Sequence, residues 1–166
     1  GSDASAIVAD RVFALDVAND RSAAAVAQVG PNASGQLHME IRKHERGPHW
    51  VIPYLVEMFM QNPKAPRRIY LVPGGQSAAM EASLVEADIE VIILKRAEYA
   101  AACAALYDGV TSRTLRHRKT GQVPLDVAIG GAAWSVTDAR VWDRKKSTTD
   151  ISPLVAATAA LWGWRI

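Results

Sequence analysis

The sequence predicts an α/β fold, built on a mixed five-stranded sheet with helices on both faces. Three apolar stretches near the N-terminus, residues 11–18, 22–29 and 36–44, are separated by short polar turns. Strands joined in this way pair as an antiparallel meander. Further along the chain, amphipathic segments alternate with short apolar runs, and strands that alternate with helices pair in parallel through right-handed crossovers. The meander and two parallel strands therefore form one sheet.

The individual elements follow from local patterns. The polar turn NDR leads from the first strand into the second, and GPNASGQ leads into the third. Residues 49–62 have helical periodicity, with Pro53 in the first turn, where proline is tolerated. The run IEVIIL at 89–94 indicates a strand buried on both faces. The other predicted elements are a strand at 67–72, helices at 75–87, 97–110, 123–134 and 151–162, and a polar loop at 112–122.

Composition narrows the class of protein. Of the 166 residues, 49% are hydrophobic, which is enough for one sizeable core. The net charge of +2 permits an anionic partner without requiring one. The single cysteine, Cys103, excludes a disulfide within the chain and a cysteine-based zinc site, and its alanine-rich surroundings indicate a buried small side chain in a cytosolic protein. We expect residues 1–10 to be a tag remnant and linker, because the chain begins Gly-Ser, and residues 11–166 to be one domain.

Several motif-defined enzyme classes are excluded. The segment PGGQSA at 73–78 lacks the lysine of a phosphate-binding P-loop, and neither HExxH nor GxSxG occurs in the chain. No apolar stretch reaches the 18 or so residues that a membrane span needs, and no secretory signal is visible.

An acid inside a strand is the first candidate site residue. In the first predicted strand Ala14 and Asp16 point to one face, and Phe13 and Leu15 point to the other. Burying an unpaired carboxylate is costly, so Asp16 needs a partner, a turn to cap or a metal ion. Pattern alone leaves two interpretations open: Asp16 caps the turn that follows, or it binds a metal at the end of a central strand.

The second candidate is Asp150. It precedes a periodic apolar run whose predicted face comprises Ile151, Leu154, Val155, Thr158 and Trp162. With Pro153 in the first turn, spacing alone favours a helix N-cap over a metal ligand for Asp150.

Two basic clusters are the third feature. They contain Arg113, Arg116, His117, Arg118 and Lys119 in one loop, and Arg144, Lys145 and Lys146 ahead of Asp150. Such runs are commonly solvated loops, but lysine and arginine bordering one site would suit contacts with DNA phosphates.

Five stretches together resemble the C-terminal nuclease domain of phage terminase large subunits, nearest to those of actinobacterial phages and prophages. They are FALDVANDRSAAAVA, GPHWVIPYLVEM, ALYDGVTSRTLRH, PLDVAIGGA and, most specifically, VWDRKKSTTDISPLVAATAALWG. The resemblance runs from Arg11 to Trp162 and implies a ribonuclease-H-like fold. In that family the domain follows an ATPase motor, which this chain lacks.

The resemblance implies a function. The family packages viral DNA, and its nuclease cuts concatemeric double-stranded DNA with two Mg²⁺ or Mn²⁺ ions held by acidic side chains. Asp16 matches the acid on the first strand, and Asp150 matches the acid at the start of the last helix. The implied partners are double-stranded DNA, the portal and the small terminase subunit, and the implied location is the cytoplasm of a bacterial host.

The sequence departs from the family at the end of the fourth strand, where members carry another acid. The matching place here is Val72 or Pro73. Asp20, Glu81 and Asp138 are conceivable substitutes, and His117 could approach the site, although its position favours a histidine of a surface loop. The departure leaves three hypotheses: a metal-dependent endonuclease, a degenerate module that binds DNA or the portal, and a different enzyme of similar fold, such as a junction resolvase or a sugar-kinase-like phosphotransferase.

Overall fold

The computed structural model describes residues 5–8, 10–117, 142 and 150–165, and the predicted helix at 123–134 lies outside these residues. The strands are β1 (Val12–Val17), β2 (Ala23–Pro31), β3 (Leu37–Arg46), β4 (Arg68–Leu71), β5 (Glu90–Ile93) and β6 (Leu115–His117). The helices are α1 (Val51–Gln61), the 3₁₀ turn η1 (Gln76–Met80), α2 (Glu81–Glu86), α3 (Arg96–Thr111) and α5 (Ser152–Arg165). None of the described helices is long and apolar enough to cross a membrane.

The strands form one mixed sheet in the order β5-β4-β1-β2-β3-β6. Strands β1, β2 and β3 are the expected antiparallel meander, and β4 and β5 continue the sheet in parallel beyond β1. The predicted fold class is therefore confirmed, but the predicted strand count of five was wrong. The sixth strand, β6, pairs in parallel with β3 inside the stretch predicted to be a loop. Its three residues are too few to give an alternation of apolar and polar side chains.

Strand β5 differs from its prediction in a second way. It is an edge strand, and its end residues Glu90 and Ile93 are exposed, so it is not buried on both faces. An apolar run shows that side chains pack, but it does not show whether a strand has a neighbour on each side. Val91 and Ile92 are half-buried and pack into the two cores on opposite faces.

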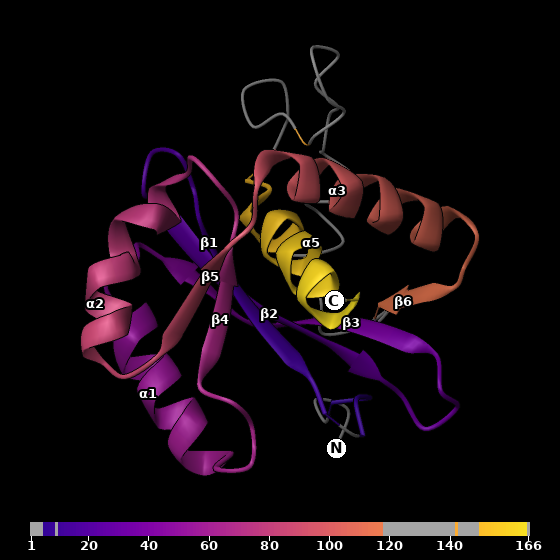
Figure 1. Ribbon diagram of the computed structural model, residues 1–166, viewed down its shortest axis with the longest axis horizontal. Coiled ribbons are helices and arrows are strands. Elements are labelled where there is room, and N and C mark those ends of the chain that lie inside the picture. Colours follow the sequence, from indigo (N-terminus) through magenta and orange to yellow (C-terminus); the bar gives the residue numbers. More distant parts are fainter. Residues whose placement is uncertain (1–4, 9, 118–141, 143–149, 166) are drawn as a thin grey trace.

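Helices cover both faces of the sheet (Figure 1). On one face α1 and α2 enclose a core that contains Phe13, Leu15 and Val17 of β1. On the other face α5 and α3 enclose a second core, which contains Ala14 of β1. The period-two alternation of β1 therefore divides its side chains between two layers, as the sequence predicts, and Asp16 belongs to the α5 layer.

Helix α5 is enclosed on nearly all sides. Every residue from Ile151 to Leu161 is buried, so the prediction of a single apolar face was too narrow. The helix packs on β1 and β2 and is covered by α3. A Cβ on Gly163 would approach the Tyr70 ring to 2.6 Å and Val12 Cγ1 to 2.7 Å, so glycine lets the end of the helix lie against the sheet.

The segment expected to be a linker contacts the sheet. Ile7 is buried, and the backbone amide of Val8 donates to the carbonyl of Pro31 at 3.0 Å. The Glu40 carboxylate, 2% exposed, accepts hydrogen bonds from Ser5 Oγ, the Ala6 amide and Gln28 Nε2. These bonds fix the described residues 5–8 along β2 and β3.

Candidate nuclease site

The candidate site begins at Asp16, which lies near the carboxyl end of β1 and is fully buried. Asp16 is opposite Ala25 of β2, and Ala25 is opposite His44 of β3. Residues directly opposite each other in a sheet point to the same face. Asp16, Ala25 and His44 therefore form one row on the face that α5 covers, with Asp16 and His44 two strand spacings, about 10 Å, apart along the sheet.

A β-bulge brings His44 to this face. Val26 pairs with Lys43, but the next residue, Ala27, pairs with Ile41, so β3 contains one extra residue. One extra residue reverses the side-chain alternation beyond it. Without the bulge, His44 would share a face with Glu40, away from Asp16. Simple alternation along the strand does not predict His44 at this site, because no residue in LHMEIRKHER marks the bulge.

Asp150 lies at the N-terminal end of α5 and connects the helix to this row. Its Oδ2 accepts a hydrogen bond from His44 Nε2 at 2.9 Å and another from Ser152 Oγ at 2.9 Å. Its Oδ1 accepts from the backbone amide of Ser152, the first residue of α5, at 2.9 Å. Ile151, whose carbonyl accepts from the Val155 amide, is the N-cap residue, so the predicted N-cap role of Asp150 is displaced by one position. Asp150 bonds to the first helical residue from the preceding position, and it also faces the β1–β3 row.

The surroundings of Asp150 favour its charged form. Burial alone would raise the pKa of this carboxyl group, but the hydrogen bonds from His44 and Ser152 outweigh burial and hold the pKa below its ordinary value. An ionised carboxylate only accepts hydrogen bonds, so His44 Nε2 carries the proton of the 2.9 Å bond. The site therefore keeps a negative charge on Asp150 at neutral pH.

Asp20, a predicted substitute ligand, lies in the turn that follows β1. Hydrogen bonds from Ser22 lower its pKa, and the negative charge of Asp150 weakly opposes that shift. Asp20 is exposed in the turn after β1, and its Oδ1 accepts from the Ser22 amide at 3.0 Å. Glu81, another considered substitute, is exposed at the start of α2, on the opposite face of the sheet.

Val72, one of the two places where the resemblance leads us to expect an acid, directly follows β4. Ala14 of β1 pairs with Tyr70 of β4 in parallel, and the same register carried two residues further brings Val72 beside Asp16. Val72 is 3% exposed and belongs to the core on the α5 face. Of the two residues considered for the missing acid, Val72 is therefore the one that belongs to the layer containing Asp16.

The donor atoms of this row suit a hard divalent cation. Mg²⁺ is commonly bound through one or two carboxylates together with substrate phosphates, and Asp16 and Asp150 supply two carboxylates on one face. Among the described residues, no group of three or more His, Cys, Asp or Glu side chains is arranged to hold a metal ion. Asp16 and Asp150 therefore offer the type of donor that such a cation uses together with phosphate oxygens.

Some of the predicted basic residues lie away from His44, and the others lie outside the described residues. Arg116 pairs with His38 at the start of β3, six residues before His44, so Arg113 and Arg116 lie toward the opposite end of that strand. Arg113 and Arg165 line a cavity of about 450 Å³ there. His117 ends β6. The remaining predicted residues, Arg118, Lys119, Arg144, Lys145, Lys146 and Asp138, lie outside the described residues.

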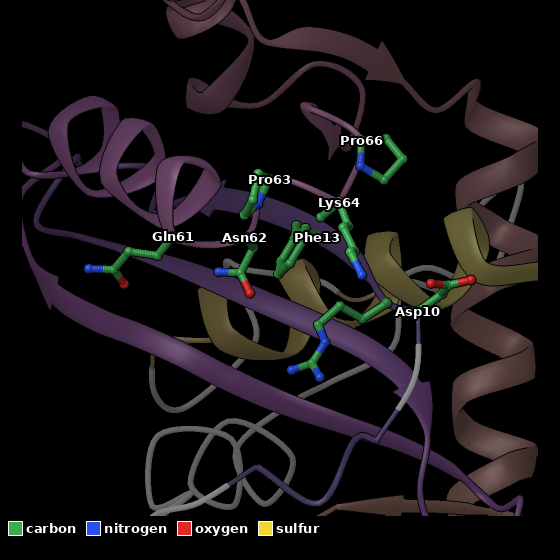
Figure 2. Close-up of a pocket in the computed structure, with 9 residues that line it drawn as sticks. Asp10, Phe13, Gln61, Asn62, Pro63, Lys64 and Pro66 are labelled. Atoms are coloured by element: carbon green, nitrogen blue, oxygen red, sulfur yellow. The ribbon is translucent and has the colours of Figure 1, made fainter.

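A second cavity, of about 350 Å³, is separate from the row of acids. It lies at the start of β1, where Asp10 and Phe13 meet the chain that follows α1. Figure 2 shows the Phe13 ring between Asn62 and Lys64 in this cavity. Asp16 is at the other end of β1, so the cavity does not extend the candidate site.

Comparison with solved structures places this geometry in a known fold. The large terminase of bacteriophage HK97 superimposes with a TM-score of 0.75 at 11% sequence identity, over 96% of this chain and 40% of that one. The fold is that of a terminase nuclease domain. The nuclease domain of the large terminase subunit of bacterial virus Sf6, solved with manganese, superimposes with a TM-score of 0.62 at 12% identity, over 95% of this chain and 89% of that one.

The expected ribonuclease-H-like architecture is thereby confirmed at the level of fold. The chain spans less than half of the HK97 terminase that it matches. RuvC of T. thermophilus, solved in complex with a Holliday junction substrate, superimposes with a TM-score of only 0.43 at 12% identity. No protein-family model matches the sequence, and no curated protein matches it by sequence.

Proposed function

We propose that this chain is the metal-dependent endonuclease domain of a phage terminase large subunit, which cuts concatemeric double-stranded viral DNA. One observation carries the proposal: a fully buried aspartate on the central strand β1 shares a sheet face with an aspartate at the start of α5. Carboxylate oxygens are the ligands that Mg²⁺ prefers, and one or two carboxylates can share such a cation with the phosphates of a bound substrate. The fold shared with terminase nuclease domains supports the same conclusion.

In the proposed chemistry, side chains of the protein hold a cation, and the cation acts on water and phosphate. Asp16 and Asp150 would hold Mg²⁺ or Mn²⁺ beside the scissile phosphodiester. A divalent cation bound there lowers the pKa of water and stabilises negative charge on phosphate oxygens. Asp150 contributes a carboxylate that stays ionised, because His44 and Ser152 donate hydrogen bonds to it. The backbone of β1 and the start of α5 fix both acids before DNA arrives.

Contacts with DNA are assigned to the basic residues. Arg113 and Arg116, which lie toward the other end of β3 from His44, would bind phosphates away from the row of acids. Together with the predicted cations of residues 118–119 and 144–146, they would give affinity with little sequence preference. The portal and the small terminase subunit are proposed partners of the longer protein, and the bacterial cytoplasm is its proposed location. The proposed DNA contacts, partners and location follow from the resemblance to phage terminase large subunits.

A plasmid-nicking assay tests the proposal. Supercoiled DNA is incubated with the chain in Mn²⁺, Mg²⁺ or EDTA, and with Asp16→Asn and Asp150→Asn. Asp108→Asn, which changes an exposed acid on α3, serves as a matched control. We expect cleavage in metal by the parent and the control, and a loss of at least about a hundredfold in both site variants. Equal cleavage by Asp16→Asn and the parent would reject the proposal.

The position of Val72 favours a second candidate function. A valine where the family carries an acid is compatible with a module that binds DNA or the portal without cutting. That candidate predicts retention of a duplex in a gel-shift assay with no nicking in any metal. Selective cleavage of four-way junctions over linear duplex would instead indicate a resolvase.

A further inference from the structure

We propose that His44 is a positioning residue of the metal centre: its hydrogen bond to Asp150 Oδ2 leaves Oδ1 as the oxygen that binds the cation. This inference rests on the proposed function and assigns a role to a residue that neither the motifs nor the fold comparison identifies.

The hydrogen bonds of Asp150 carry the argument. A carboxylate has about four lone-pair positions, two on each oxygen. His44 Nε2 and Ser152 Oγ occupy both positions on Oδ2, each at 2.9 Å. The Ser152 amide occupies one position on Oδ1, also at 2.9 Å. One position is left, and it is on Oδ1, so Asp150 is arranged to bind a metal through a single oxygen.

Ser152 alone would not fix the carboxylate in this way. Its two bonds come from the same residue at the start of α5, so they hold Asp150 relative to the helix only. His44 is 106 residues away in sequence and belongs to the sheet. Its bond therefore ties the orientation of Asp150 to the strand row that contains Asp16, and this connects the two acids across the interface between sheet and helix.

The local structure indicates that the contact is built for this purpose. The side chains of His44 and Asp150 are 25% and 29% exposed, so their bond is partly shielded from water. The one-residue bulge in β3 directs His44 to the α5 face. Bulges commonly re-aim side chains beside active sites. Groups that hydrogen-bond to metal ligands orient them, and their loss typically reduces metal affinity about 10–100-fold.

Mn²⁺ affinity, measured by calorimetry and by the free-ion electron paramagnetic resonance signal, tests the role without relying on cleavage. His44→Met keeps a side chain of similar size without a donor, whereas the Gln amide of His44→Gln reaches a similar point with one. His49→Ala removes an exposed imidazole five residues further along the chain and serves as the control. Thermal unfolding in EDTA confirms that each variant folds.

We expect His44→Met to weaken Mn²⁺ binding about 10–100-fold, with most of the affinity restored in His44→Gln and none lost in His49→Ala. Equal affinity in folded His44→Met and the parent would overturn the positioning role. Tighter binding by His44→Met would also overturn it, because His44 would then compete with the cation. Failure of the parent itself to bind Mn²⁺ would reject the proposed function, and this inference with it.

Discussion

Replacing Val72 with aspartate tests whether the layer beside Asp16 is a metal centre. Val72 is 3% exposed and at the level of Asp16 in the parallel β1–β4 pair. Val72→Asp restores a carboxylate at the position where terminase nuclease domains are expected to have one. Val72→Asp should lower the stability of the fold when no metal is present, and a bound metal should recover much of that loss. Metal would not rescue an ordinary polar substitution in the core.

The expected magnitude follows from burial. Losing a buried valine side chain costs about 1.5–3 kcal/mol, and a carboxylate beside buried Asp16 adds the cost of desolvation, reduced when one of the two acids keeps a proton. We expect a loss of about 3 kcal/mol or more in EDTA, which lowers the thermal midpoint by about 6–12 °C for a chain of this size. Mn²⁺ at 100 times its dissociation constant returns about 2.7 kcal/mol by mass action.

The assay is thermal unfolding with and without Mn²⁺, followed by circular dichroism. Val29→Asp is the matched control, because Val29 is fully buried in the same core and pairs with Val12 at the other end of β1. Mn²⁺ should stabilise Val72→Asp more than the parent and should not rescue Val29→Asp. Equal responses of the two aspartate variants to Mn²⁺ would refute the reasoning.

Three further predictions concern the framework of the site. Gly163→Ala should destabilise the fold by about 1–3 kcal/mol in urea unfolding, because the new Cβ would approach the Tyr70 ring to 2.6 Å. The gain of about 1 kcal/mol in helix propensity does not offset this clash. Unchanged stability would contradict the prediction and show that α5 can shift. Burial by itself would raise the pKa of Glu40, but hydrogen bonds from Ser5, Ala6 and Gln28 outweigh burial and hold the pKa below its ordinary value. Glu40 thus contributes stability above pH 4.5 that is lost as pH falls through its folded-state pKa. Glu40→Gln should lower stability at pH 7 by about 1–3 kcal/mol and flatten the acid limb of a pH–stability curve; an unaltered limb would contradict this. Burial raises the pKa of the Cys103 thiol to about 11. A thiol reagent at pH 8 should therefore label Cys103 only after the protein unfolds. Rapid labelling of the native protein would contradict the place of Cys103 in the core.

Much of the fold was predictable because it depends on local patterns. The alternation in β1 gave the correct faces for Ala14, Asp16 and Phe13, and the short turns gave the meander. Cys103 is fully buried, as its alanine-rich surroundings predicted. The edge position of β5 and the existence of β6 were not predictable in this way, because both depend on which strand has a neighbour in the finished sheet.

The candidate site likewise contains two residues that local sequence patterns reveal and one that they do not. Asp16 stands out because it interrupts an apolar strand, and Asp150 stands out because it precedes a periodic helix, so both could be found from sequence. The structure shows that Asp150 bonds to the start of α5 through Oδ1 and to His44 through Oδ2, and its role as a metal ligand stays a prediction. His44 was hidden, because a single bulge between Val26 and Ala27 reverses the face that simple alternation assigns to it.

Locating a bound ion tests the central claim most directly. Crystals of the chain soaked in Mn²⁺ would be measured at the manganese absorption edge, where anomalous scattering marks the ion. We predict a peak with both Asp16 and Asp150 among its ligands, and no such peak in crystals of Asp16→Asn. A Mn²⁺ peak elsewhere on the protein, with none at these two aspartates, would contradict the account.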